Sequence, residues 1–380
     1  VDFSRIKATD SVNVLCSEHG FGMMGGTAYA EILKTIRDMV VEKTGATKIK
    51  LGFACGLNRV EALEILPEHG LDKHYEGQTF QFGPYDKGVP IDTEIGRLYG
   101  IGIAFKANKI IHVHYDDPRE LHFHRLNGRA MKAFTMSYAR LETRSVYHTQ
   151  FPTQSANIVP RLIYESDFIQ KKFAFSTTLS TSPAGVIGVE ANNSLIELDK
   201  VLTERTLRNY GKLVKLFESL DECIVVIDGH RWLNYSHAGG MTSCNLFFGP
   251  QDYLDLDLNV TRKNQTSAVK AIVINYMWKQ AFAMSEIPVI SAQPSISRLF
   301  QRRGVEKQFY ACEGLTEAME KAYEVTDTRK VIVFDGTYGA INCSPELAEE
   351  FITKAPQVSE EVEQVHLPKW LKQRGLVPAH

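Results

Sequence analysis

The stretch that decides the fold is VNVLCSEHGFGMMGGTAYAEILKTIRDMVVEKTGATKIKLGFAC, residues 12–55. It opens with one apolar run, Val12–Cys16, and closes with another, Ile49–Cys55. Between the two runs, apolar residues recur from Tyr29 to Val40 at the spacing of one helical face, and Gly45 supplies a C-terminal stop. The pattern predicts strand, loop, helix and strand, which is typical of the opening of a parallel sheet.

The rest of the chain continues this alternation. Leu71–Pro90 is rich in Gly, Asp and aromatic residues and lacks a period, so we expect a loop there. The acidic stretch Pro356–Pro368 indicates a terminal helix or tail. The other expected elements are helices over Val60–Leu66, Leu202–Leu220, Thr266–Met284 and Leu315–Val325, and strands over Ala107–Val113, Phe173–Thr178, Cys223–Ile227, Ile287–Ser291 and Lys330–Phe334.

Two α/β domains are therefore expected, each with a mostly parallel sheet flanked by helices, and with the active site in the interdomain cleft. The boundary is expected near residues 148–157, which carry Thr, Gln, Ser and Pro without apolar periodicity. This predicts an N-terminal, cofactor-binding domain over residues 1–155, a second domain over 156–350, and a C-terminal helix or tail over 351–380.

The composition is that of an ordinary globular protein. The chain has 380 residues, of which 44% are hydrophobic and 23% are charged, and its net charge is −2. The sequence has no excess of positive charge of the kind that binds nucleic acid or an anionic membrane, so neither is expected as a partner. The apolar stretches are shorter than the ~20 residues of a membrane span, no signal peptide opens the chain, and the six cysteines form no C-x-x-C pair. We expect a cytoplasmic protein.

Gly20, Gly22 and Gly25 have G-x-G-x-x-G spacing, after a predicted strand and before a predicted helix. Such a loop allows close backbone approach, and the amides of the helix N-terminus attract phosphate. A dinucleotide site also needs an acidic residue at the end of the second strand, and Phe53–Asn58 contains no carboxylate. A cradle for a mononucleotide phosphate or another anion is favoured, and a structural glycine turn and an NAD(P) site stay open.

Histidines gather in the segment between Tyr99 and Phe151. In an extended strand, two that are separated by one residue share a face. With Asp116 or Asp117 such a pair offers zinc ligands, although each such histidine is more often a hydrogen-bonded structural group. The residues concerned are His112, His114, His122, His124 and His148, with Lys132 among them.

Four segments resemble the nickel-pincer lactate racemase family. They are the opening stretch, residues 88–111 (GVPIDTEIGRLYGIGIAFKANKII), residues 127–132 (NGRAMK) and residues 313–336 (EGLTEAMEKAYEVTDTRKVIVFDG). In that family a catalytic histidine lies ten residues before the cofactor-binding lysine, and a nickel-binding histidine lies sixteen residues after it. This chain has His122 ten residues before Lys132 and His148 sixteen residues after it.

The resemblance implies a nickel-pincer nucleotide, a pyridinium mononucleotide with two sulfur donors and one carbon donor to nickel. Lys132 would tether it through a thioamide and His148 would be the fourth ligand, a soft square-planar set that suits Ni(II). The Gly20–Gly25 loop would take its phosphate. His122 would take the hydroxyl proton of a 2-hydroxy acid while hydride moves reversibly, which makes the chain a racemase or epimerase. Proteins that make and insert the cofactor are further implied partners.

The chain departs from the family at two loops. The family's G-x-His-Arg loop is Gly56-Leu57-Asn58-Arg59 here, and an amide at Asn58 cannot accept the proton. The family's Asp-x-Thr-Arg is Glu18-His19-Gly20-Phe21, which keeps a carboxylate and lacks the arginine. His19 is a candidate second base. These changes favour a different small-molecule substrate, such as a sugar acid.

The segment 259–265 loosely resembles the family's Asn-Leu-Tyr-Gln-x-x-Lys stretch. Arg262, Lys263 and Gln265 would then contact the substrate anion, with Arg262 favoured because a guanidinium binds a carboxylate in two places. Solvated charges at a helix start are the other interpretation. An NAD(P)-dependent oxidoreductase that uses Gly20–Gly25 is the second candidate function, and a cofactor-free binding protein of the same fold is the third.

Overall fold

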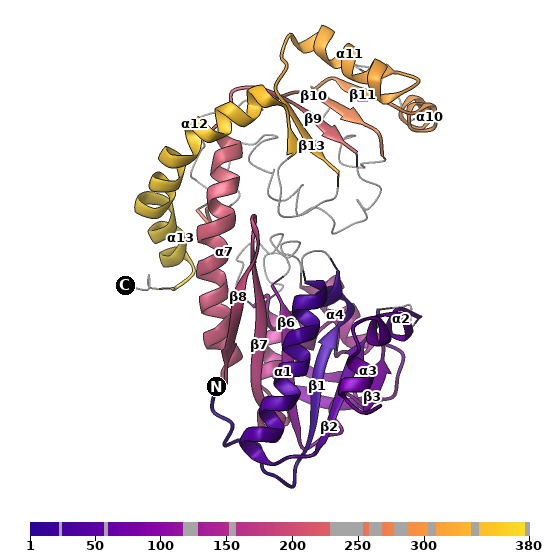
Figure 1. The fold of residues 1–380 in the computed structure, drawn as a ribbon, viewed down its shortest axis with the longest axis vertical. Helices are drawn as coiled ribbons and strands as arrows, with labels where there is room; N and C mark the ends of the chain where they lie inside the picture. The colour runs from indigo at the N-terminus through magenta and orange to yellow at the C-terminus, as the bar shows by residue number, and fades with distance from the viewer. Residues whose placement is uncertain are drawn as a thin grey trace. The chain divides into compact units, whose positions relative to one another are not determined.

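The computed structural model describes residues 1–22, 25–56, 60–116, 128–151, 157–228, 254–257, 268–276, 287–302, 309–335 and 342–376. The chain divides into two units, Val1–Thr203 and Glu204–His380. Each unit has a six-stranded, mostly parallel sheet with helices beside it (Figure 1). The expected α/β class is therefore confirmed.

The first sheet has the strand order β3-β2-β1-β6-β7-β8. Its strands run parallel except for β8, which pairs antiparallel with β7 and has no second neighbour in the described part of the chain. On β8, the side chains of Val186, Ile187 and Val189 are exposed. The strands are β1 (Ser11–Ser17), β2 (Lys48–Ala54), β3 (Thr79–Phe82), β6 (Lys109–Tyr115), β7 (Phe173–Ser182) and β8 (Gly185–Asn192), and β4 (Gly88–Thr93) and β5 (Gly96–Ile101) form a separate hairpin.

Helices cover both faces of this sheet, which explains why the residues of β1 that point to either face are apolar, apart from the hydrogen-bonded Asn13. Val12, Val14 and Cys16 join the core under α1, α2 and α3, whereas Leu15 joins the core under α4, α5, α6 and the start of α7. A strand that is buried on both faces needs no polar alternation. The helices are α1 (Gly26–Thr44), α2 (Val60–Glu68), α3 (Leu71–His74), α4 (Leu141–Gln150), α5 (Ile158–Glu165), α6 (Asp167–Lys172) and α7 (Leu195–Glu218).

The strand order reverses beside β1. The chain moves outward from β1 to β2 and β3, then returns to the other side of β1 to form β6 and continues outward to β7. Loops that leave the carboxyl ends of β1 and β6 therefore lead to opposite sides. In open α/β sheets this is where ligands bind.

The second sheet has the order β12-β11-β10-β9-β13-β14. β9 contributes Cys223 and Val225 to the core beside α12, and Ile224 and Val226 to the core beside α11. The elements are β9 (Cys223–Ile227), β10 (Val269–Ile274), β11 (Val289–Ser291), β12 (Phe309–Ala311), β13 (Val331–Phe334), β14 (Asn342–Cys343), α10 (Pro294–Arg302), α11 (Leu315–Thr326), α12 (Pro345–Glu361) and α13 (Leu367–Gln373).

Two expectations about elements are wrong. The helix expected over Thr266–Met284 is in part strand β10, a buried run whose β-branched residues suit a strand. A short apolar run of this kind does not reveal its period. The loop expected over Leu71–Pro90 holds α3, β3 and the start of β4.

The division of the chain also falls later than the boundary that we expected between residues 155 and 156. Strands β7 and β8 extend the first sheet, so residues up to Thr203 belong to the first unit. The expected terminal segment, residues 351–380, is part of the second unit, where Val362, Trp370 and Leu371 are fully buried. Among the described residues, no helix combines the length and the apolar character needed to span a bilayer.

Candidate functional site

The candidate site lies at the carboxyl edge of the first sheet, beside the reversal of strand order. There β1 runs into η1, a single 3₁₀ turn over Glu18–Phe21. β6 ends with His114 and Tyr115, and Asp116 follows. A third segment, residues 128–134, ends in η3, a 3₁₀ turn over Lys132–Phe134. Most of the polar groups at this edge come from these three segments.

His112 is a structural histidine. Its ring is buried, its Nε2 lies 3.0 Å from the carbonyl oxygen of Ala130, and its Nδ1 lies 2.7 Å from the hydroxyl of Tyr138. Because a carbonyl only accepts, Nε2 carries a proton; the Tyr138 hydroxyl also lies 3.1 Å from the carbonyl oxygen of Leu15. Burial lowers the pKa of His112 to about 4, so the ring is neutral at neutral pH.

The side chain of His114 is half-buried, and it lacks such support. Its Nε2 has no hydrogen-bond partner among the described residues. Removal of its ring from water holds the pKa of His114 well below its ordinary value, and the nearby charges of Arg129 and Lys132 lower it further. The structure therefore gathers a lysine and an arginine around one neutral imidazole.

Three hydroxyl side chains of β7 lie on the same face of the sheet. Residue 176 pairs with His112 and residue 178 with His114, and side chains at paired positions share a face. Ser176, Thr178 and Ser180 are buried, and no hydroxyl of the three has a hydrogen-bond partner in the described part of the chain. Unpaired buried polar groups are costly, so they mark a place where a ligand could provide partners.

Two buried acids, Asp116 and Asp199, anchor the turn that carries Lys132. Arg129 Nη1 lies 2.9 Å from Asp116 Oδ1, and both side chains are almost fully buried. Asp199 of α7 accepts hydrogen bonds from the backbone amides of Gly128 (2.6 Å) and Ala130 (3.3 Å). Burial raises the pKa of Asp199 to about 6, although these amides and the Arg129 charge oppose the shift. Lys132, half-buried, is thus set on an anchored turn.

The loop after β1 presents Glu18 and His19. Glu18 Oε2 accepts a hydrogen bond of 2.9 Å from the amide of Gly56, which ties this loop to the end of β2. The other oxygen, Oε1, lies 4.0 Å from Nδ1 of His19, whose side chain is 52% exposed. The imidazole is accessible and sits beside a carboxylate, as a proton acceptor requires.

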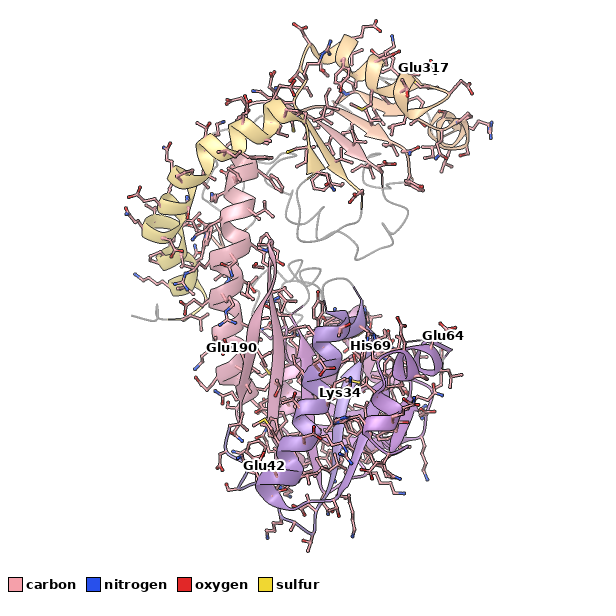
Figure 2. The ribbon with its side chains drawn as sticks, viewed as in Figure 1. Lys34, Glu42, Glu64, His69, Glu190 and Glu317 are labelled. Atoms are coloured by element: carbon pink, nitrogen blue, oxygen red, sulfur yellow. The ribbon has the colours of Figure 1, made fainter. Side chains whose placement is uncertain are left out.

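Phe21 belongs to the core. Its ring centroid lies 5.2 Å from that of Tyr29, 5.6 Å from that of Phe53 and 5.3 Å from that of His69, which is labelled in Figure 2. Phe21 stands where the resembled family has an arginine. This position therefore offers no cation to a substrate.

Two of the three glycines have packing reasons. A Cβ at Gly20 would overlap the ring of Tyr29, whose hydroxyl donates a 2.7 Å hydrogen bond to the carbonyl of Val113. A Cβ at Gly25 would overlap the carbonyl oxygen of Gly20. At Gly22 the nearest atom to an added Cβ is the carbonyl oxygen of His19, 3.9 Å away, so packing alone does not require a glycine there.

Helix α4 contributes Arg144 and His148. Arg144 is half-buried, its Nε donates to the carbonyl of Ala139 at 3.1 Å, and burial lowers its pKa while the Glu18 carboxylate acts against that shift. His148 is exposed, and its Nδ1 donates a 2.8 Å hydrogen bond to the carbonyl of Arg144. In the neutral ring, Nε2 then keeps its lone pair, which is the tautomer that a metal-binding histidine adopts.

The structure thus brings Glu18, His19, Lys132 and the glycine loop to one edge, and it adds residues to which sequence reasoning gave no role there. In the sequence, His112 and His114 lie in the same hydrophobic strand, so nothing predicted different roles for them. The one sequence signal for Arg144 is its position four residues before His148, which places the two side chains on one face of a helix. The other added residues are Arg129 and Asp199. Six predicted site residues lie outside the described residues: His122, Asn58, Arg59, Arg262, Lys263 and Gln265.

A zinc site with Asp116 is not favoured, because Arg129 occupies that carboxylate. Within the described ranges, no group of three or more His, Cys, Asp or Glu side chains is arranged to hold a metal ion. Asp117 lies outside those ranges. No protein-family model matches the sequence, and no curated protein matches it significantly.

Proposed function

We propose that the protein is an isomerase, a racemase or epimerase of a 2-hydroxy acid, that works at the carboxyl edge of the first sheet. One observation carries the proposal. Lys132 is carried by a turn that Asp199 anchors, and the accessible imidazole of His19 lies beside Glu18 at the carboxyl end of β1, where the strand order reverses. An amine and an imidazole that can accept a proton therefore share one edge.

The proposed cofactor is the nickel-pincer nucleotide that the sequence resemblance implies. Lys132 would hold it covalently, and the anchoring of its turn by Asp199 suits a tether. His148 would give Nε2 to the nickel, since its Nδ1 proton is already donated to the Arg144 carbonyl. When bound, the group supplies a reversible acceptor for the substrate's hydride. The residues around it have to bind the acid and move one proton.

His19 and Arg144 have suitable places for those two tasks. His19 is half-exposed beside Glu18, so its imidazole can take the hydroxyl proton while the carboxylate stabilises the imidazolium. Arg144 is half-buried, which lowers its pKa, and it is near enough to Glu18 for that carboxylate to act against this shift. Its planar guanidinium suits the carboxylate of the substrate. His122 and Arg262 remain the sequence-based candidates for the same two roles.

The experiment tests the tether, the metal and the reaction together. We expect protein made together with the cofactor-synthesis proteins of the resembled family to carry nickel and added mass on Lys132. Lys132→Ala should lose both, whereas the matched control Lys106→Ala, an exposed lysine, should keep both. Protein in which neither nickel nor a Lys132 adduct is found would contradict the proposal.

A solvent-isotope measurement separates this chemistry from other racemases. Hydride transfer returns the same hydrogen to carbon, so a racemised 2-hydroxy acid recovered from heavy water should carry no deuterium at its carbinol carbon. Extensive deuterium there would indicate proton abstraction from carbon and would contradict hydride transfer. A panel of lactate-like acids and sugar acids defines the substrate.

The second candidate is an NAD(P)-dependent oxidoreductase. It is favoured by the glycine loop, which lies at the strand reversal as in dinucleotide-binding folds. It is disfavoured because β2 ends at Ala54, and Cys55 and Gly56 follow without a carboxylate for the ribose. Saturable quenching of NADH fluorescence by protein that carries no Lys132 adduct would favour this candidate.

A further inference from the structure

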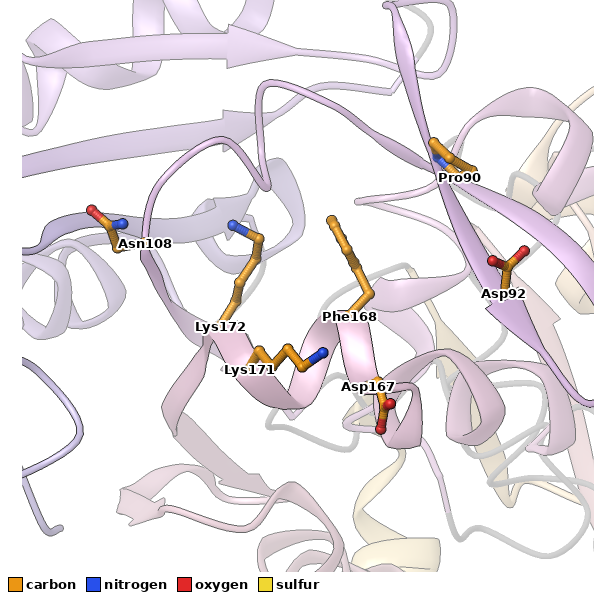
Figure 3. Close-up of a pocket in the computed structure, with 7 residues that line it drawn as sticks. All are labelled: Pro90, Asp92, Asn108, Asp167, Phe168, Lys171 and Lys172. Carbon is orange, nitrogen blue, oxygen red and sulfur yellow. The ribbon is translucent and has the colours of Figure 1, made fainter.

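A separate cavity of about 660 Å³ opens at the amino edge of the first sheet. Asn108 lies just before β6, whereas His114 lies near its end, and seven residues of strand span about 20 Å. The cavity therefore lies at the opposite edge from the candidate site. Its lining residues are Pro90, Asp92, Asn108, Asp167, Phe168, Lys171 and Lys172 (Figure 3).

One end of the cavity is cationic. Lys172 Nζ donates to the carbonyl of Ala107 at 2.8 Å, and Lys109 Nζ donates to the carbonyl of Lys171 at 3.1 Å. No carboxylate forms an ion pair with Lys109, Lys171 or Lys172 in the part of the chain that the structure describes. Burial lowers the pKa of Lys172, and the neighbouring charge of Lys109 adds to the shift. A bound anion would relieve this repulsion between like charges.

Asn108 adds a neutral donor at the same end. Its Oδ1 accepts hydrogen bonds from the amide of Ser11 (3.0 Å) and the hydroxyl of Ser11 (2.8 Å), which sets the orientation of the side-chain amide. Figure 3 shows the nitrogen of Asn108 turned toward the ammonium group of Lys172. Two groups that only donate therefore face one another, and an anion can accept from both.

The middle of the cavity is apolar and flat. The ammonium of Lys172 lies 5.7 Å from the ring centroid of Phe168, and Phe105 packs edge-on against that ring at 5.8 Å. Figure 3 shows the Phe168 ring between Lys172 and Pro90. A ring held in this way offers a surface on which a planar group can stack.

The other end carries acceptors. Asp92 lies in β4, where Arg97 donates to it at 2.7 Å, and Asp167 lies in the first turn of α6. Both carboxylates line the cavity beyond Phe168 (Figure 3). They suit a ligand whose far end has N–H or O–H donors.

We propose that this cavity binds a nucleoside 5′-monophosphate. The phosphate lies at Lys172 and Asn108, the base stacks on Phe168 against Pro90, and the donors of the base or sugar face Asp92 and Asp167. Lys171 lines the cavity between these two ends, with its ammonium toward Asp167 (Figure 3). A volume of about 660 Å³ is within the range of small-molecule sites. The site shares no residue with the proposed isomerase site, so it is a second ligand site of the same unit.

Titration calorimetry with adenosine 5′-monophosphate tests the proposal on the full chain. We expect saturable binding that is at least about tenfold tighter than that of inorganic phosphate, because the stacked base adds to the affinity. Lys171→Glu should weaken binding about tenfold or more through charge reversal. The matched control Lys106→Glu has the same charge change in a nearby exposed residue outside the lining, and should stay within about twofold.

Phe168→Leu separates the stacked base from the phosphate. It should weaken nucleotide binding about tenfold while leaving phosphate binding unchanged. Equal affinities for nucleotide and phosphate, or equal effects of Lys171→Glu and Lys106→Glu, would overturn the proposal. If the nucleotide binds at the glycine loop instead, the Lys171→Glu variant should bind it as tightly as the parent protein does. That result would also overturn the proposal. Circular dichroism confirms that each variant is folded.

Discussion

At the scale of single residues, His112 makes stability depend on pH. Its pKa is about 4 in the folded protein and 6.5 in an unfolded chain. A depressed folded pKa means that the stabilisation is complete above pH 6.5 and is lost as the pH falls to 4. The free energy of unfolding should drop by up to about 3 kcal/mol through this change, and His112→Gln should reduce the drop. Urea unfolding between pH 7 and pH 4 measures both.

Asp199 acts in the opposite direction over the same range. Its folded pKa of about 6 is raised above the ordinary 3.8, so its contribution is present below pH 3.8 and is lost as the pH rises through 6. Asp199→Asn should therefore steepen the acid loss that His112 causes. A variant with a shallower pH dependence than the parent would contradict the buried, ionisable role that we assign to Asp199.

Gly20 and Gly22 form a matched pair for testing the glycine loop. Gly20→Ala places a methyl group in the Tyr29 ring and should lower the free energy of unfolding by about 1–3 kcal/mol, the usual cost of overpacking. Gly22→Ala meets only one atom, at 3.9 Å, and should change stability by less than about 0.5 kcal/mol. The midpoints of denaturant unfolding compare the stabilities of the two variants with that of the parent protein. Equal destabilisation would show that the loop needs glycine for another reason.

At the scale of elements, the end of β6 and the lysine-bearing turn are joined by the buried pair Asp116–Arg129. Breaking a buried pair from one side leaves an unpaired charge, so Asp116→Asn or Arg129→Met should each cost about 3–5 kcal/mol. The double variant removes both charges and should recover part of the loss. Chemical unfolding of the four proteins gives the coupling energy, and strictly additive losses would argue against a coupled pair.

The elements that sequence patterns predicted well are those with an unambiguous period. The face from Tyr29 to Val40 defines α1, and Gly45 ends it in the left-handed conformation with φ 72°. β10 was missed because its short run of five apolar residues, interrupted by one lysine, fits a strand and a buried helix equally well. The short β3 was missed although Thr79, Phe80 and Phe82 suit a strand, because four residues within a segment rich in Gly and Asp are too few to show a period.

The candidate site was predictable only in part for the same reason. The glycine spacing indicated a binding loop after the first strand, and only the family resemblance grouped Glu18, His19 and Lys132 in one site. The hydrogen bonds that distinguish His112 from His114, and the anchoring of residues 128–130 by Asp199, depend on packing between segments distant in sequence. No local pattern carries that information.

At the scale of the whole molecule, the two units have separate cores. We expect each unit to unfold in its own transition, as independent domains do. The three tryptophans, Trp232, Trp278 and Trp370, all lie in the second unit, so their fluorescence follows that unit, whereas circular dichroism follows both. Gly20→Ala should shift only the dichroism transition of the first unit. A single transition that is the same by both probes would contradict this expectation.

The unpartnered side of β8 has a practical consequence. In the described part of the chain no strand pairs with the outer side of β8, and the side chains of Val186, Ile187 and Val189 are exposed, so this border is a template to which another extended chain can add. Edge-to-edge self-association in concentrated solution should begin at this border. A lysine introduced there is a reasonable first change for anyone who wishes to crystallise or store the protein.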